Sequence, residues 1–173
     1  MKRVLSALCC LAVFSLPALA QKTKAPMSDQ EFVDFVAQTD MVEANLGQLA
    51  QDVAATQSIK DYGKMLETDH KDNYQKLQSL AQQNGFTVPT AIDAKNNKTV
   101  IGPFHQLKGA AFDHKYIPAM VTGHTQAVAL FKKEADDAQS SALKTFAQDT
   151  LPVLEKHLDD AKTIQHGKTP AGM

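Results

Sequence analysis

Residues 28–53 read SDQEFVDFVAQTDMVEANLGQLAQDV. The stretch opens with Ser28 and Glu31 at the spacing of a capping box, in which each side chain binds the backbone N–H of the other residue and starts a helix. Beyond this box, apolar side chains recur at the spacing of one helical face, at Phe32, Phe35, Val36, Leu46, Leu49, Ala50 and Val53. The pattern predicts a long amphipathic helix that buries one face.

Three more segments of the chain have this helical pattern. A second helix follows a turn at residues 56–58 and ends at Asn84-Gly85, a typical helix C-terminus. A third is expected over residues 106–136 and a fourth over residues 141–165, with bends at Pro118 and Pro152. We expect the following phenylalanines in the core: Phe32, Phe35, Phe112, Phe131 and Phe146.

Residues 86–104 are expected to be irregular, because Pro89, Asn96-Asn97 and Gly102-Pro103 interrupt them. Short links after the first and third helices favour antiparallel pairs, whereas this connection is long enough to run the length of the helices. One long crossover among short loops is the ferritin-like connectivity. The sequence thus predicts an all-α, ferritin-like four-helix bundle with a long connection between the second and third helices; a plain up-down-up-down bundle is the alternative.

The N-terminus has the pattern of a secretory signal peptide. Lys2 and Arg3 precede an apolar run over residues 4–16, and Ala18-Leu19-Ala20 is a small-x-small cleavage pattern. We therefore expect residues 1–20 to be removed, residues 21–27 to be a linker, residues 28–165 to form the bundle and residues 166–173 to be a flexible tail. The expected location is periplasmic or secreted, and both cysteines lie within the predicted signal, so no disulfide is expected in the mature chain.

Composition limits the possible functions. The 173 residues are 43% hydrophobic with a formal net charge of −1, which fits one domain with a sizeable core. This charge balance argues against a nucleic-acid partner. No apolar run after the predicted signal is long enough to span a membrane. The chain has no phosphate-binding loop, nucleophile elbow or His-Glu-x-x-His motif, so hydrolase and nucleotide-binding functions are not supported.

Each predicted helix carries one ionisable residue within its apolar stripe. At about 100° per residue, Glu43, His70, His124 and His157 point in the same direction as the apolar residues of their own helices. Glu43 and His70 also lie at nearly equal distances from the first turn, and His124 and His157 differ in height by less than one helical turn, about 5 Å. We expect all four side chains to point inward near the middle of the bundle.

These side chains are suited to binding a metal. Imidazole and carboxylate groups are ligands of iron, manganese, zinc and copper, and Glu67 forms with His70 the E-x-x-H spacing of carboxylate-bridged metal bundles. The candidate ligands are Glu43, Glu67, His70, His124 and His157. Because the last two helices lack the bridging carboxylates of di-iron proteins, di-iron oxidase or ferroxidase chemistry is disfavoured, and a mononuclear site with three histidines and one carboxylate fits better.

Residues next to these candidates have expected roles of their own. Asp69, Asp113 and Asp160 flank them and are expected to hydrogen-bond metal ligands from outside. Gly47 and Gly123 are expected to permit close helix packing. The other histidines are expected at the surface: His105, His114 and His166.

Four segments resemble the bacterial exported family called domain of unknown function 4142. They are MVEANLGQLA at residues 41–50, TDHKDN at residues 68–73, GAAFDHKYIPAMVTGHTQAVALF at residues 109–131 and TLPVLEKHL at residues 150–158. The resemblance covers about residues 28–164 and implies a ferritin-like fold and export, but no established activity. It also implies that Glu43, His70, His124 and His157 form the family's polar layer.

Two functions are open at this point. One is an envelope protein that binds a transition metal through the Glu/His cluster. The other is a non-catalytic envelope stress or interaction protein in which the same layer is a structural polar network, since buried acids and imidazoles can satisfy one another by hydrogen bonds. The first predicts a metal-ion partner and the second an envelope protein partner, and the sequence identifies no catalytic residue.

Overall fold

The computed structural model describes residues 27–172, and these residues form helices and no strand. Four helices are long: α1 (Asp29–Val53), α2 (Gln57–Asn84), α4 (Gly109–Asp137) and α5 (Ser141–Gln165). The predicted all-α class is therefore confirmed. The predicted signal peptide and almost all of the predicted linker lie outside the described residues.

The helix ends follow from local sequence. Ser28 caps α1, and the predicted capping box with Glu31 is present. Gly85 ends α2 in a left-handed conformation with φ of 76°, which glycine adopts at little cost. Helices α4 and α5 continue through Pro118 and Pro152. The expected start of α4 at residue 106 is three residues early, because Phe104 accepts a turn hydrogen bond from Leu107 before the helix begins.

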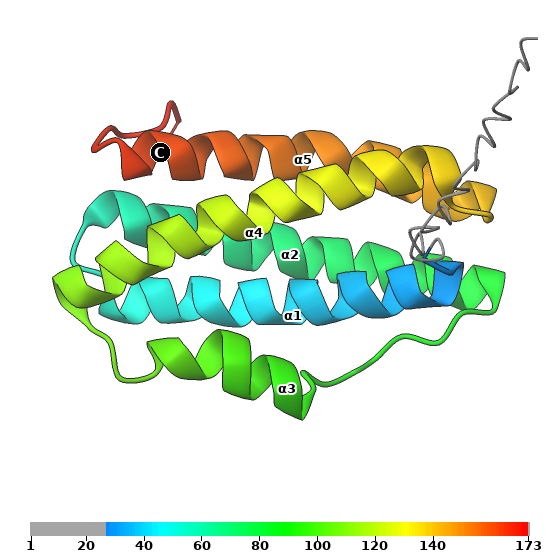
Figure 1. The fold of residues 1–173 in the computed structure, drawn as a ribbon, viewed down its shortest axis with the longest axis horizontal. Coiled ribbons are helices and arrows are strands. Elements are labelled where there is room, and N and C mark those ends of the chain that lie inside the picture. Colours follow the sequence, from blue (N-terminus) through cyan, green and yellow to red (C-terminus); the bar gives the residue numbers. More distant parts are fainter. Residues whose placement is uncertain (1–26, 173) are drawn as a thin grey trace, which may run out of the picture.

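Figure 1 shows the course of the chain. Helices α1 and α2 form one antiparallel pair, and α4 and α5 form another. The connection after α2 returns along α1 to the other end of the molecule before α4 begins, so α2 and α4 run in the same direction. Sequence alone did not establish whether this connection crosses the length of the helices. In the structure it does.

The sequence had suggested that the connection is irregular throughout, and this expectation is wrong. The connection contains three consecutive short helical segments, α3 (Ala94–Asn96), η1 (Asn97–Ile101) and η2 (Gly102–Phe104). Gln38 of α1 holds it by donating to the carbonyl of Ala91 and accepting from the backbone N–H of Asp93. Ile101 and Phe104 are buried. Tertiary contacts thus stabilise helical structure that local periodicity does not reveal.

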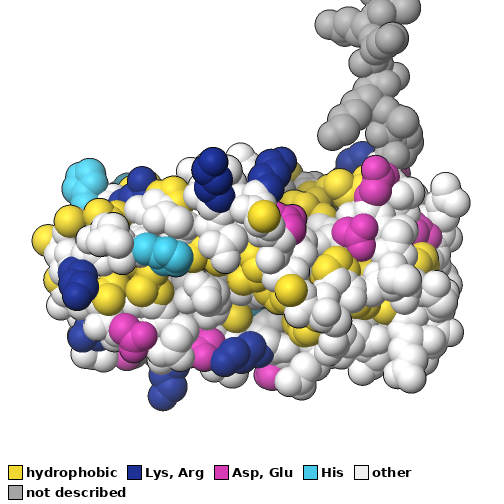
Figure 2. Space-filling view, turned by 90° about the horizontal axis from the view of Figure 1, so that it is seen from below, with side chains coloured by type: hydrophobic (Ala, Val, Ile, Leu, Met, Phe, Trp, Pro, Cys, Tyr) yellow, Lys and Arg dark blue, Asp and Glu magenta, His cyan; other side chains and the backbone are white. Residues whose placement is uncertain are grey.

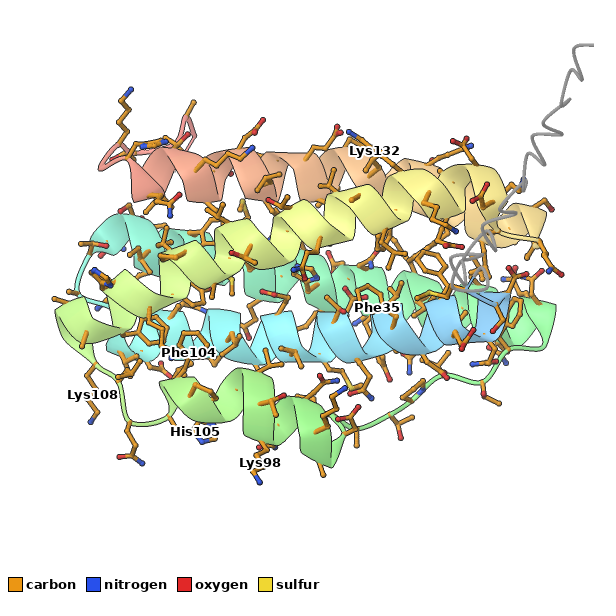
Figure 3. All side chains as sticks on the ribbon, viewed as in Figure 1. Phe35, Lys98, Phe104, His105, Lys108 and Lys132 are labelled. Carbon is orange, nitrogen blue, oxygen red and sulfur yellow. The ribbon has the colours of Figure 1, made fainter. Side chains whose placement is uncertain are left out.

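The apolar core has two parts. One surrounds Phe32, Leu77 and Phe131 near the start of α1, and the other surrounds Leu46, Leu66 and Phe112 nearer its end. Most of the buried polar side chains occur at intermediate positions along the helices. Phe35 departs from its predicted core position, since 36% of its surface is exposed (Figure 3).

Glycines set the spacing of α1 and α2. A Cβ at Gly47 would lie 2.5 Å from the carbonyl oxygen of Gly63, so the two backbones approach too closely for any side chain. Gly123 is different, because a Cβ there would meet only Glu43 Oε1 at 3.9 Å. The expectation of close packing is thus confirmed at Gly47 and wrong at Gly123.

The outer surface is mixed in character. Lysine and acidic side chains alternate on the face that carries the connection, without a large area of one sign (Figure 2). Within residues 27–172, no helix is both long and apolar enough to cross a membrane.

Candidate metal centre

Three histidines from three helices meet in the interior. His70 of α2, His124 of α4 and His157 of α5 are 3%, 2% and 1% exposed. One ring nitrogen from each lies within 4.8 Å of one from each of the others. Their ring centroids are 5.3–5.9 Å apart. These three residues therefore lie inward and close together, as their stripe direction and height predicted, and we call them the histidine cluster.

Two of the rings are oriented by carboxylates outside the cluster. His70 Nδ1 lies 2.8 Å from Asp40 Oδ1, and His157 Nε2 lies 2.8 Å from Asp69 Oδ2. A carboxylate only accepts hydrogen bonds, so the ring nitrogen that faces it carries the hydrogen. In the neutral ring, the opposite nitrogen then presents a lone pair to the cluster.

The third ring is oriented by the backbone of its own helix. His124 Nδ1 donates to the carbonyl of Met120, one turn earlier, at 3.0 Å. Within the described part of the chain, three buried ring nitrogens have no hydrogen-bond partner: His70 Nε2, His124 Nε2 and His157 Nδ1. They are the nitrogens opposite the outer partners. Three lone pairs can therefore face one another, an arrangement that favours a cation.

Glu43 lies beside this cluster, outside the group of ligand atoms that come within 4.8 Å of one another. It is buried on α1, lines a cavity together with His70 and His124, and its Oε2 has no hydrogen-bond partner among residues 27–172. Burial raises the pKa of the Glu43 carboxyl, and the charge of His70 only partly offsets this. Gly123 faces the same carboxylate from α4 and leaves space around it.

Comparison with protein families now identifies the chain. The family model described as Domain of unknown function (DUF4142) matches residues 15–164. The chain belongs to this family. The resemblance noted from the four quoted segments is thereby confirmed. No curated protein and no solved structure matches the chain.

The buried ionisable groups of this DUF4142 protein shift one another's pKa. Burial alone would lower the pKa of His70, but the hydrogen bond to Asp40 and the charges of Asp40 and Glu43 outweigh it, and the pKa is raised. Burial and the charges of the other two histidines lower the pKa of His124 to about 3. Burial also lowers the pKa of His157, despite its bond to Asp69. Of the three histidines, His70 therefore binds a proton most readily.

Asp40 contacts the histidine cluster and was not among the site residues predicted from the sequence. It is 2% exposed, and its second oxygen accepts from Asn73 Nδ2, whose own side-chain oxygen accepts from Thr150. This chain of hydrogen bonds joins α1, α2 and α5 to the back of His70. Its position four residues after Val36 and three before Glu43, on the buried face, was the available signal.

The other predicted site residues are distributed as follows. Glu67 is half-buried and bonded to Gln51 and Lys71, and the structure does not bring it into the histidine cluster. Of the three flanking acids, only Asp69 bonds a cluster histidine. Asp113 instead accepts from the backbone N–H groups of residues 55 and 56, and Asp160 from the ammonium of residue 156.

The remaining histidines are exposed, as predicted: His105, His114 and His166. Figure 3 shows His105 on the connection, outside the long helices. The chain therefore divides its six histidines equally between the cluster and the surface. This division provides matched controls for mutagenesis.

Proposed function

We propose that this protein is an exported, ferritin-like four-helix bundle of the bacterial envelope that binds one transition metal ion through His70, His124 and His157, with Glu43 available as a fourth ligand. The observation that carries the proposal is the set of buried, unpartnered ring nitrogens that face one another. Each ring is held from behind by a hydrogen-bond acceptor, as is usual for metal-bound imidazoles.

The course of the connection supports the ferritin-like part of the proposal. It links the parallel helices α2 and α4 across the length of the molecule, whereas the other two links are short. Ferritin-like bundles have this one long crossover, and plain up-down-up-down bundles do not.

The donor set favours zinc, copper(II) or iron(II), with manganese(II) a weaker ligand match, because the cluster offers imidazoles and no thiolate. Tetrahedral zinc with Zn–N bonds of about 2.0–2.1 Å separates its nitrogen ligands by about 3.3 Å. The cluster nitrogens lie within 4.8 Å of one another, so binding zinc would require them to approach by up to about 1.5 Å. Three histidines leave one coordination position for Glu43, water or a small ligand.

Calorimetric titration with zinc or copper, together with elemental analysis, tests the proposal. We expect one ion per chain in the wild-type protein and none in His70→Ala/His124→Ala. The matched control replaces all the surface histidines: His105→Ala, His114→Ala and His166→Ala. It should bind as the wild type does. Equal binding by the cluster variant, or loss of binding in the surface variant, would contradict the proposal.

The partners behind the rings give a finer test. Asp40→Asn keeps the size of the side chain but removes the charge that orients His70. Because such outer partners typically contribute 10–100-fold to metal affinity, we expect the dissociation constant to rise by about that factor. Glu67→Gln should leave the constant unchanged, since Glu67 bonds Gln51 and Lys71.

Export is tested separately. Expression of the full chain in a bacterium, followed by fractionation and mass measurement, should yield a periplasmic or secreted product that begins at Gln21. A full-length product retained in the cytoplasm would contradict this part of the proposal.

A non-catalytic envelope interaction or stress protein is the second candidate. The hydrogen bonds from Thr150 through Asn73 and Asp40 to His70 favour it, because they join three helices without any ion. Under this alternative, His70→Ala lowers the melting temperature, zinc does not change it, and capture of an envelope protein depends on surface residues.

A further inference from the structure

A groove of about 610 Å³ lies between α2 and α5, and the histidine cluster forms part of its wall. His70 and His157 both line it, and each is more than nine-tenths buried and has a ring nitrogen without a partner. Asn73 and Thr150, from the hydrogen-bond chain behind His70, line it as well. The groove thus reaches the cluster from the surface.

The lining of the groove is acidic. Asp69, Asp72 and Asp149 contribute carboxylates, and Lys76 contributes the one ammonium group among the lining residues. Asp72 and Asp149 are exposed, and neither makes a hydrogen bond or ion pair within the part of the chain that the structure describes. Asp69 connects the surface of the groove to the histidine cluster, because its side chain is 36% exposed and its Oδ2 accepts a hydrogen bond from His157.

A second opening approaches the cluster from another side and has a different character. It measures about 330 Å³, lies between α1, the connection and α4, and reaches Glu43, His70 and His124. Phe35 and Val100, both partly exposed, line it. The only ionisable groups that line it are the buried ones at its inner end. A hydrated cation gains no attraction at this mouth.

We propose that divalent metal ions reach the histidine cluster through the groove between α2 and α5, where Asp72 and Asp149 attract the hydrated ion and Asp69 guides it to His157. This inference rests on the proposed metal-binding function and adds a route to it. The two unpaired carboxylates supply the attraction, and the unpartnered imidazoles supply the destination. Fixed charges at the mouth of a cleft raise the local concentration of an oppositely charged ligand and its association rate.

The route predicts a kinetic effect that a purely structural role would not produce. Cobalt(II) is a suitable probe, because its visible absorption changes when imidazoles replace water, so stopped-flow absorbance follows its arrival at the cluster. We expect Asp72→Asn/Asp149→Asn to slow cobalt association about tenfold at low ionic strength. The difference should disappear at about 0.5 M salt, where the charges are screened. The amount of cobalt bound at equilibrium should stay at one ion per chain.

Two control variants identify the cause. Asp52→Asn/Asp159→Asn removes the same net charge from exposed positions that do not line the groove, and it should change the rate by less than about twofold. Gln126→Lys places a positive charge at the mouth of the second opening and should also leave the rate unchanged. All of these residues are exposed, so the variants should fold.

The outcomes separate the two proposals. If neither the wild type nor any variant binds cobalt, the proposed metal-binding function is wrong, and the proposed route is wrong with it. If the wild type binds one ion but Asp72→Asn/Asp149→Asn associates at the wild-type rate, only the route is overturned. Slower association in Gln126→Lys alone would show that ions use the second opening instead.

Discussion

Alanine at Gly47 and alanine at Gly123 are the same chemical change in two helix interiors, but they should alter the free energy of unfolding in opposite directions. At Gly47 the added Cβ would lie 2.5 Å from the carbonyl oxygen of Gly63 and 2.9 Å from the backbone nitrogen of Glu67. Neither atom can rotate away, because both belong to the backbone of α2. The two helices must therefore separate.

The magnitudes follow from these contacts. Overpacking costs about 1–3 kcal/mol, and a clash with backbone atoms belongs in the upper half of that range. Alanine recovers up to about 1 kcal/mol of helix propensity, so Gly47→Ala should lose about 1–2 kcal/mol. At Gly123 the nearest atom to the Cβ is Glu43 Oε1 at 3.9 Å, an ordinary contact distance. Only the propensity remains there, and Gly123→Ala should gain about 0.5–1 kcal/mol.

Urea unfolding followed by circular dichroism measures both changes, because the chain is helical and has no tryptophan. The midpoint should fall for Gly47→Ala and rise for Gly123→Ala, with equal slopes against urea. A Gly47→Ala variant with the urea midpoint of the wild type would refute the close approach of α1 and α2. A loss of more than about 1 kcal/mol at Gly123 would refute the open space beside Glu43.

Three further predictions concern the helix cap and the buried histidines. Ser28→Ala removes the capping box of α1 and should lower the urea midpoint by the equivalent of about 1 kcal/mol. The pKa of His70 is raised, so below that pKa a metal ion must displace the proton of His70. Zinc affinity measured by titration should therefore rise with pH until the raised pKa is passed and then level off. Zinc affinity that does not depend on pH would contradict this. The pKa of His124 is about 3 in the folded protein, below the value of about 6.5 for a histidine in the unfolded chain. As the pH falls from about 6.5 toward 3, the unfolded state therefore takes up a proton at this residue and the folded state does not. The free energy of unfolding therefore falls by about 1.4 kcal/mol per pH unit in this range. Urea midpoints at successive pH values should show a smaller loss of stability in acid for His124→Leu than for the wild type. An unchanged pH dependence would contradict a neutral, buried His124.

Much of the helical structure could be predicted from local sequence. The capping box at Ser28 and the end at Gly85 act within one helical turn, so both boundaries could be identified without knowledge of the fold. The helical part of the connection could not. Its Ile101 and Phe104 are buried by contacts with other segments, and Gln38 of α1 holds its start across a long sequence separation.

The candidate site was predictable to the same extent. His70, His124 and His157 were found because stripe direction and height depend only on helix geometry and on short links. Asp40 was missed because an aspartate on a helix is usually exposed, and its burial depends on contacts with His70 and Asn73 of another helix. Glu67 lies one helical turn before His70, but side chains at positions i and i+3 point in directions about 60° apart around the helix axis. That angle allows Glu67 to turn toward Gln51 and Lys71.

The three inward nitrogens are the reason we propose a metal site over a purely structural layer, because without an ion they have no hydrogen-bond partner among the described residues. A buried acceptor without a partner costs about 1–3 kcal/mol. One proton, held at His70 by Asp40, turns one nitrogen into a donor that can serve one neighbour, so either His124 or His157 still lacks a partner. A single metal ion accepts all three lone pairs at once. Asp40, Asp69 and the Met120 carbonyl already bond the outer nitrogen of each ring, so in the neutral rings the inner nitrogens are the ones left to bind the ion.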